Sequence, residues 1–227
     1  MKTASLRRKA RRVHKILLDF FGEPKWGNPL PALDELVSTI LSQNTNDINR
    51  DRAFEALRKK MPTWKAVRDA PLAQVVEAIS PAGLANQKGP RIQKALLQIT
   101  EERDQLDLDF LREWSPQEVR AWLTRFHGVG PKTASIVMQF SLDIPAFAVD
   151  THVHRITGRL GLRPEKMSAD DTHAHMESLL LPDTYGVAHM NLIRLGREVC
   201  RARRPDCPNC PLRRMCLFYK NGRTNAI

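Results

Sequence analysis

The sequence predicts an all-α protein with about ten helices. Apolar residues recur at three- and four-residue intervals along most of the 227-residue chain, which is the spacing of one face of a helix. Side chains that cap helices precede several of these stretches, and glycine and proline separate them. Short apolar runs such as residues 146–149 have the composition of a strand, but the sequence offers no strand to pair with them.

The first helices are delimited by glycine, proline and capping residues. A basic N-terminal helix ends at residues 22–24, where glycine and proline break the pattern. Pro31 is expected in the first turn of the next helix. The apolar face of that helix consists of Leu33, Leu36, Val37, Ile40 and Leu41. Residues 46–61 are expected to form another helix, with Thr45 as its N-cap.

Later helix starts carry the same signals. Thr63, Ser115 and Ser168 each precede a helical run, and Ser115 with Glu118 resembles a capping box. The run Pro81-Ala82-Gly83 breaks the chain between two helices. A last apolar stripe leads directly into Cys200 and consists of Ala188, Leu192, Leu195 and Val199.

Positive charge is concentrated at the two ends of the chain. The formal net charge is +11, and the pI is about 9.9. Residues 1–26 and residues 197–227 each hold eight Lys and Arg against two acidic residues, so each end carries +6 and the interior carries −1. This distribution predicts that both ends form one surface that binds a polyanion. Charge alone leaves RNA, an anionic membrane or a merely solvated surface as alternatives.

No segment carries the signature of a membrane span or a secretory signal. No stretch approaches the roughly 18 consecutive apolar residues that a span requires. The basic N-terminus lacks the apolar core of a signal peptide. We therefore expect a soluble protein in the cytoplasm, without a membrane partner.

All four cysteines lie within seventeen residues near the C-terminus. They are Cys200, Cys207, Cys210 and Cys216, with the spacing C-x6-C-x2-C-x5-C. Such clustering in an intracellular chain favours a metal site over disulfides. The single C-x2-C unit favours an iron–sulfur cluster, because zinc sites with four cysteines usually contain two such units. The spacing by itself leaves zinc as an alternative.

A basic loop lies between the first two cysteines. It contains Arg201, Arg203 and Arg204. Closing a metal site at both ends of the loop would hold these arginines in place, and we expect them to contact phosphate rather than bases. A solvated charged loop is the alternative interpretation.

A glycine-containing turn between two helices predicts an anion site. Gly128, Val129 and Gly130 follow one helix, and Pro131 begins the next. Glycine lets the backbone approach a ligand, and the amides at a helix start attract an anion. Lys132 lies in this first turn, where the helix dipole favours the neutral amine, the form that acts as a nucleophile. The alternative is a lysine that stays charged and binds phosphate.

Asp150 follows eighteen residues after Lys132. It is well placed to cap the helix that begins at the next residue. The functional interpretation is a carboxylate that stabilises developing positive charge and assists proton transfer. One side chain can do both, because capping also fixes the position of the carboxylate.

Together these motifs resemble the endonuclease III family of helix-hairpin-helix DNA glycosylases, iron–sulfur branch. The resemblance extends from Leu33 to Cys216. It rests on residues 128–134, residues 149–152 and the four cysteines. It implies two lobes: a six-helix barrel over residues 32–144 and a cluster lobe. The cluster lobe combines residues 1–31 with residues 145–227, and the hairpin itself spans about residues 116–141.

The resemblance also implies the roles of individual residues. Lys132 is the nucleophile that displaces the base and forms an imine, and Asp150 is the catalytic carboxylate. The cysteines would hold a 4Fe–4S cluster, and His152 of the same motif as Asp150 would contact DNA. Gln43 or Asn44 would fill the gap left by a flipped base, and the sequence leaves open which one. Leu84 would be the wedge that separates bases, with an ordinary core leucine as the alternative.

The expected function is a bifunctional DNA glycosylase and AP lyase of base excision repair. Its expected partner is double-stranded DNA with an oxidised pyrimidine or an abasic site, bound by a monomer near the nucleoid of a prokaryote. A mismatch-specific thymine or uracil glycosylase of the same fold is one alternative, and a non-catalytic DNA-binding module is another.

Overall fold

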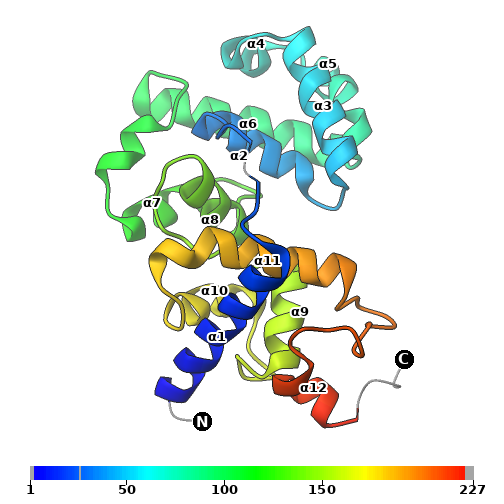
Figure 1. Ribbon diagram of the computed structural model, residues 1–227. Helices are drawn as coiled ribbons and strands as arrows, with labels where there is room; N and C mark the ends of the chain where they lie inside the picture. The colour runs from blue at the N-terminus through cyan, green and yellow to red at the C-terminus, as the bar shows by residue number, and fades with distance from the viewer. Residues whose placement is uncertain (1–2, 26, 223–227) are drawn as a thin grey trace. The chain divides into compact units, whose positions relative to one another are not determined.

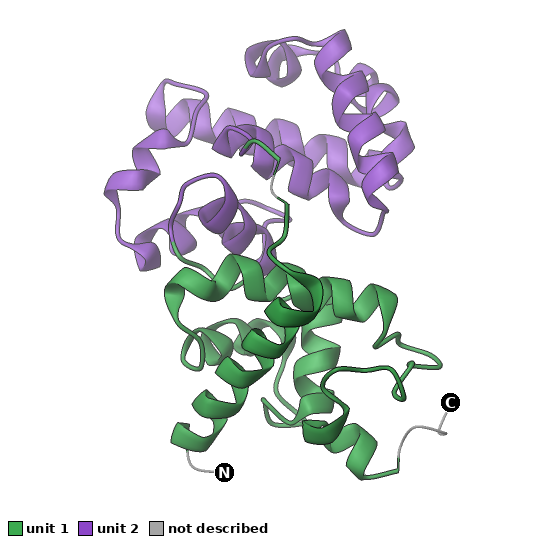
Figure 2. Cartoon of the chain, in the orientation of Figure 1, with its two compact units in different colours: residues 1–28, 145–227 green, residues 29–144 purple. Residues whose placement is uncertain are grey.

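The computed structural model describes residues 3–25 and 27–222 and contains only helices and connecting segments in that part of the chain (Figure 1). The fold is all-α, as predicted. The chain forms two compact units, one made of residues 1–28 and 145–227 and the other of residues 29–144 (Figure 2). Met1, Lys2 and Trp26 of the basic N-terminal segment lie outside the described residues. None of the described helices combines the length and apolarity that a bilayer span requires.

The middle unit, residues 29–144, contains seven α-helices and two short 3-10 helices among its described residues. They are α2 (Ala32–Ser42), α3 (Asp47–Lys60), α4 (Trp64–Asp69), α5 (Leu72–Ala78), η1 (Ser80–Ala82), α6 (Ala85–Arg103), η2 (Asp109–Glu113), α7 (Pro116–Leu123) and α8 (Pro131–Phe140). α2 is the central helix of this unit, since eight of its eleven residues are buried. It packs against α3, α6 and α8. Leu36 and Ile40 are fully enclosed, and each such side chain contributes about 1.5–3 kcal/mol.

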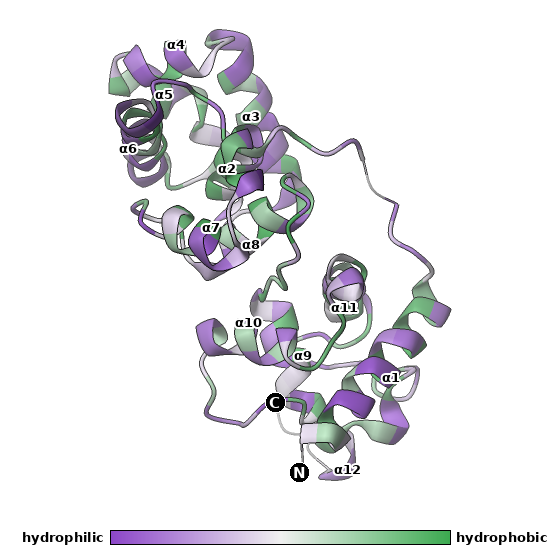
Figure 3. Ribbon diagram, turned by 90° about the vertical axis from the view of Figure 1, so that its left-hand side faces the viewer, coloured by the Kyte–Doolittle hydropathy of each residue, from purple (hydrophilic) through white to green (hydrophobic). Residues whose placement is uncertain are grey.

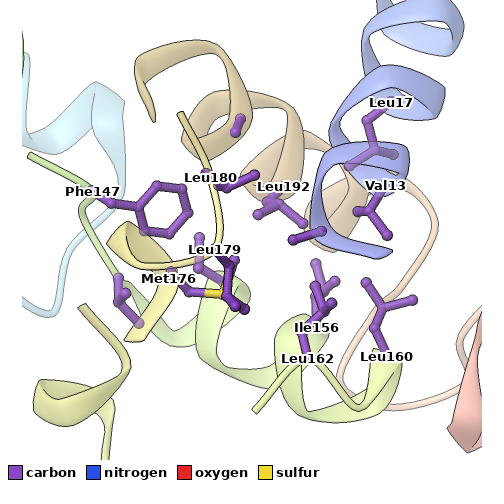
Figure 4. Close-up of a cluster of buried hydrophobic side chains, with 14 of the residues drawn as sticks. Val13, Leu17, Phe147, Ile156, Leu160, Leu162, Met176, Leu179, Leu180 and Leu192 are labelled. Carbon is purple, nitrogen blue, oxygen red and sulfur yellow. The ribbon is translucent and has the colours of Figure 1, made fainter. Parts of the chain in front are cut away.

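The other unit is assembled from both ends of the chain. Its helices are α1 (Thr3–Phe21), α9 (Thr151–Leu160), α10 (Ala169–Glu177), η3 (Pro182–Thr184), α11 (Tyr185–Glu198), η4 (Arg213–Met215) and α12 (Leu217–Lys220). α1 and α9 both pack against α11, and α12 packs against α9. α1 carries apolar and polar residues in alternation along its turns (Figure 3). Its buried side, Ala10, Val13 and Leu17, joins a core with Phe147 and Leu192 (Figure 4).

The apolar run at residues 146–149 forms no strand. It is a buried, non-helical connection, and side chains from the helices around it bond three of its backbone polar groups. The Phe147 N–H donates to the Glu177 carboxylate at 3.0 Å. Nδ1 of His173 lies 2.9 Å from the Phe147 carbonyl, and Nδ1 of His189 lies 2.9 Å from the Ala148 carbonyl. Three helix side chains therefore replace the missing strand partner.

Most of the predicted helix starts are confirmed. The side chains of Thr63, Ser115 and Ser168 accept backbone N–H groups at the starts of α4, α7 and α10, and Ser115 forms the full capping box with Glu118. Pro131 begins α8 as predicted. The described residues form twelve α-helices rather than about ten, because helices such as α4 and α12 are too short to show a periodic stripe.

Two predicted details at the start of the middle unit are wrong. Asn46, not Thr45, caps α3, because its side chain accepts the Asn49 N–H at 2.9 Å. The Thr45 N–H is instead bonded to Ser42 in the turn that ends α2. Pro31 is the N-cap residue of α2 and lies just outside its first turn.

Candidate functional site

The turn between α7 and α8 requires glycine at one of its two glycine positions. Gly128 has φ +85°, in the region that disfavours side chains. A Cβ atom at Gly128 would also lie 2.6 Å from Cδ of Arg91. The backbone conformation therefore favours glycine here, and any other residue would also displace the Arg91 side chain.

Gly130 is required for neither reason. Its φ of −96° and ψ of −179° are open to any residue, and a Cβ atom there would meet nothing within 4 Å. The neighbouring Val129 is buried, and its N–H donates to the Phe126 carbonyl at 3.0 Å. Gly130 thus leaves open space in front of the first turn of α8, which no side chain caps. Amides at such a helix start attract an anion.

The end of α2 is bonded to this glycine turn. Nε2 of Gln43 donates to the Gly128 carbonyl at 2.8 Å, and Nη1 of Arg91 donates to Oε1 of Gln43 at 3.2 Å. Both ends of the Gln43 amide therefore have protein partners. Asn44 is exposed and has a left-handed backbone, with φ +54°. The structure thus separates two neighbouring amides that the sequence left equivalent.

Leu84 is not a core residue. It is 47% exposed and precedes α6 with a left-handed φ of +51°. Bulky residues rarely adopt this conformation, because it crowds the side chain against the backbone. An exposed leucine held in a strained turn fits a contact with another molecule better than a packing role.

Lys132 lies half-buried in the first turn of α8, and its charge interacts with a carboxyl group of α2. α2 packs against α8, and Glu35 interacts electrostatically with Lys132 and Arg50. Burial raises the pKa of the Glu35 carboxyl, while the hydrogen bond from the Thr39 hydroxyl at 2.9 Å and the two positive charges act in the opposite direction. The sequence reasoning missed Glu35. The sequence feature that could have identified Glu35 is an acidic residue within a helix whose other residues are mostly buried.

Asp150 caps α9, as predicted. Its Oδ1 accepts the Val153 N–H at 2.7 Å, which holds the carboxylate at the start of the helix. His152, in the first turn of the same helix, is engaged within its own unit. A Cβ atom at Gly196 of α11 would lie 2.5 Å from Nδ1 of His152, and Arg155 lies 3.2 Å from the same nitrogen.

The four cysteines line a single pocket. The pocket is formed by Cys200, Cys207, Cys210 and Cys216 together with side chains that include Arg159, Phe218 and Tyr219. Its inner side rests on the hydrophobic core, against which three of the cysteines pack. Burial raises the pKa of the Cys210 thiol to about 11 and also raises the pKa of Cys207. Four thiols that line one pocket form a donor set that a bound metal cation would deprotonate.

Among residues 3–25 and 27–222, no group of three or more His, Cys, Asp or Glu side chains is arranged so that it could hold a metal ion as it stands. The sequence prediction of a metal site therefore rests on the donor set and its common pocket.

Two arginines of α9 hold the backbone of the basic loop. Arg159 donates to the carbonyls of Arg201 and Ala202 at 2.7 and 2.9 Å, and to Sγ of Cys200 at 3.3 Å. Arg155 donates to the Cys200 carbonyl at 3.0 Å. The sequence reasoning missed both residues, although they lie four apart on one face of a helix. The side chains of the loop itself, Arg201, Arg203 and Arg204, are exposed.

The predicted site residues thus fall into two groups. The middle unit contains the glycine turn, Lys132, the Gln43–Asn44 segment and Leu84. The unit made from the chain ends contains Asp150, His152, the cysteines and the arginine loop.

Comparisons with known proteins agree with these motifs. Residues 37–182 match the family described as HhH-GPD superfamily base excision DNA repair protein. The chain is 33% identical to endonuclease III of Thermotoga maritima over 185 residues, which cover 82% of each chain. It is 41% identical over 145 residues to a putative DNA glycosylase of Arabidopsis thaliana. That alignment covers 64% of this chain and 50% of the plant protein, so the chain spans about half the length of this relative.

Among solved structures, the fold is similar to that of endonuclease III in a non-covalent complex with DNA. The TM-score is 0.83 and the identity 26%, and the alignment covers 96% of this chain and 98% of the other.

Proposed function

The chain belongs to the HhH-GPD superfamily of base excision DNA repair proteins, and we propose that it is a bifunctional DNA glycosylase and AP lyase. It removes an oxidised or otherwise damaged pyrimidine from duplex DNA and then cleaves the strand at the abasic site. The observation that carries the proposal is a lysine in the first turn of an uncapped helix, directly after the glycine turn. The proposed monomeric state and cytoplasmic location follow from the sequence prediction above.

The amine of Lys132 is the proposed nucleophile. The target nucleotide must first leave the base stack, because its C1′ atom is shielded in the duplex. The neutral amine attacks C1′, the C1′–N bond breaks, and the base departs with the bonding electrons and takes up a proton. Opening of the sugar ring then gives an imine between Lys132 and C1′.

Strand cleavage follows from the imine. Loss of a proton from C2′ breaks the C3′–O bond by β-elimination, and the phosphate leaves with the electron pair. Water hydrolyses the imine and restores the amine of Lys132. The Asp150 carboxylate, fixed by its bond to the Val153 N–H, stabilises positive charge on the sugar and assists these proton transfers.

The glycine turn is proposed to bind a DNA phosphate. The open space at Gly130 and the uncapped start of α8 allow a phosphate oxygen to approach backbone amides closely. Val129 supports the turn from the buried side and does not supply its own N–H, which is already donated to Phe126.

Two exposed residues of the middle unit are proposed to enter the duplex. Asn44 fills the gap left by the flipped base, because the amide of Gln43 is already bonded at both ends. Leu84 separates the neighbouring base pair, which fits its exposure in a left-handed turn. We also propose that His152, in the first turn of α9, lies close to bound DNA. Its ring contacts Arg155 and packs against Gly196.

The cysteines are proposed to hold a 4Fe–4S cluster. Four thiols lining one pocket against an apolar core fit such a group, and the Arg159 guanidinium beside Cys200 would stabilise its negative charge. When bound, the cluster would supply structural cross-linking or redox sensing rather than bond cleavage. The exposed arginines beside Cys200 would then contact the phosphate backbone from a fixed loop.

Borohydride trapping tests this function directly. Borohydride reduces an imine to a stable amine, so we expect a covalent complex between the protein and duplex DNA that contains one thymine glycol. No complex should form with the undamaged duplex. Lys132→Ala should bind the damaged duplex but form no complex. Trapping by this variant, or the absence of trapping by the wild type on both damaged and abasic duplexes, would overturn the lyase assignment.

If the wild type releases free thymine or uracil from mismatched duplexes instead, the mismatch-specific alternative holds. If it binds damaged DNA without releasing a base, the non-catalytic alternative holds.

A further inference from the structure

Lys88 is a buried cation whose role the proposed chemistry does not explain. It lies in the first turns of α6 and is only 1% exposed. Its Nζ atom donates to the Leu41 carbonyl at 2.8 Å and to the Ala82 carbonyl at 2.9 Å. Both acceptors are neutral. Burial, followed by the charge of Arg91, lowers the pKa of this amine.

A buried ammonium is an unfavourable way to fill space in a core. Removing a charge from water has a large free-energy cost, which hydrogen bonds to neutral carbonyls offset only in part. An apolar side chain of similar length would occupy the same volume without that cost. What the lysine adds is a bond to two carbonyl groups that belong to different segments of the chain.

Those carbonyls stand directly before the two segments that are proposed to enter DNA. Leu41 is followed by the turn that carries Asn44, and Ala82 is followed by the turn that carries Leu84. Both turns contain left-handed non-glycine residues, with φ +54° at Asn44 and +51° at Leu84. The strained backbone of Leu84 persists only where neighbouring structure holds it, whereas asparagine adopts this conformation more readily. The ammonium of Lys88 lies between the two turns and is bonded to the base of each.

We propose that Lys88 is a positioning residue that holds the Asn44 turn and the Leu84 turn in one fixed arrangement, so that both enter the duplex as a unit. This inference rests on the proposed function, since it assigns Lys88 to the opening of the base pair. Lys88 contacts neither DNA nor the reacting atoms, because its side chain is enclosed. Its effect is therefore confined to substrates whose target base must be opened.

The test compares two substrates with the variant Lys88→Met, which keeps the length of the side chain and removes its charge. Base release from a paired duplex that contains thymine glycol should fall roughly 10- to 100-fold under single-turnover conditions. Strand cleavage at an abasic site in a single-stranded oligonucleotide should stay within about twofold, because no base has to be displaced. Lys88→Arg, which keeps a cation, should restore most of the paired-duplex rate. Equal losses on both substrates, or no loss on either, would overturn the proposal.

Lys94→Met is the matched control. Lys94 lies on the same helix and is exposed, so its variant should behave as the wild type on both substrates. A fluorescent adenine analogue opposite the lesion reports the opening step itself, since its emission rises when it unstacks. Lys88→Met should lose this rise and Lys94→Met should keep it. If the wild type releases no base and cleaves no abasic site, the proposed function fails, while the fluorescence still decides the role of Lys88.

A double-mutant cycle tests the proposal without relying on the folding of a core variant. Asn44→Ala and Leu84→Ala both change exposed side chains. If the two turns act as a unit, the double variant should lose several-fold less opening rate than the product of the single losses predicts. Losses that multiply independently would overturn the proposal.

Discussion

The side-chain amide of Gln43 donates to the backbone carbonyl of Gly128 at 2.8 Å, across 85 residues of sequence. This bond joins the end of α2 to the glycine turn before α8. Arg91 completes the arrangement by donating to the other end of the same amide. The side chain of Gln43 therefore joins two segments of the fold, whereas the side chain of Asn44 next to it is exposed.

Alanine substitutions should separate the roles of these two amides. Gln43→Ala should lower the free energy of unfolding by about 1–2 kcal/mol, because it leaves a part-buried carbonyl without its donor. Asn44→Ala should lower it by about 0.5–1 kcal/mol, because the side chain is exposed but alanine tolerates the left-handed φ of +54° less well than asparagine does. Denaturant unfolding measures both values. Base release should fall in Asn44→Ala by more than this loss of stability explains, and a larger stability loss in Asn44→Ala than in Gln43→Ala would contradict the assignment.

The two glycines of the turn should respond differently to alanine. Gly128→Ala should destabilise the fold by about 1–3 kcal/mol, because it combines a positive φ with a contact of 2.6 Å to Arg91. Gly130→Ala should leave stability within about 0.5 kcal/mol, because its backbone is extended and its surroundings are open.

The two substitutions should rank differently by their effect on DNA affinity than by their effect on stability. The Cβ atom in Gly130→Ala would occupy the space proposed for phosphate, so the Kd for duplex DNA should rise roughly fivefold or more. Fluorescence anisotropy with a labelled duplex measures this change. Unchanged affinity in Gly130→Ala would remove the phosphate from this turn.

The pH dependence of imine trapping at Lys132 should depend on Glu35. Above its own pKa, the Glu35 carboxylate stabilises the ammonium form of Lys132. Glu35→Gln removes that stabilisation, so the neutral amine should form at lower pH. The midpoint of borohydride trapping against pH should therefore move down.

At low pH the two proteins should converge, because burial raises the pKa of Glu35 and its carboxyl becomes neutral in the wild type as well. Glu101→Gln, a change at an exposed position of α6, is the control and should leave the midpoint in place. An upward shift in Glu35→Gln would mean that the carboxylate acts as a base for the amine.

Two substitutions at Asp150 should separate its capping role from its catalytic role. Asn caps helices as well as Asp, so Asp150→Asn should keep the stability of the wild type. Asp150→Ala should lose about 1 kcal/mol, because the Val153 N–H loses its acceptor.

Both variants should lose base release by about 100-fold or more, since neither retains the carboxylate charge. Thermal unfolding and single-turnover kinetics supply the two readouts. An active Asp150→Asn would reduce this residue to a helix cap.

The cysteine pocket should bind iron. The purified protein should be yellow-brown and contain about four iron atoms per chain. Cys210→Ser should lose most of the iron and the visible absorption, because it replaces one of four thiols that line one pocket. Elemental analysis measures the metal, and Ser178→Ala, a change far along the sequence from the cysteines, is the control. Stoichiometric zinc in a colourless protein would replace the cluster assignment.

The sequence predicted elements whose causes are local. The capping box of Ser115 and Glu118, the start of α8 at Pro131 and the capping by Asp150 each depend on residues within one turn. The Thr45 prediction failed because two neighbouring residues, Thr45 and Asn46, can both cap a helix, and the turn after α2 decides between them.

Features that depend on distant partners could not be predicted. Nothing near Lys88 in the sequence indicates that its amine is enclosed by carbonyls 47 and 6 residues away. The same holds for Glu35 beside Lys132 and for Arg159 at the arginine loop. Periodicity identifies which face of a helix is buried, but it does not identify which polar side chain on that face meets which backbone group.

The assembly of one unit from both chain ends has a consequence for synthesis on the ribosome. Residues 29–144 are contiguous, so their unit has all of its helices available while the rest of the chain is still being made. The buried side of α1, in contrast, packs against α11, whose residues are translated more than 160 positions later. The nascent chain therefore carries an uncovered amphipathic helix for most of its synthesis, and we expect chaperones that shield such helices to govern the yield of folded protein.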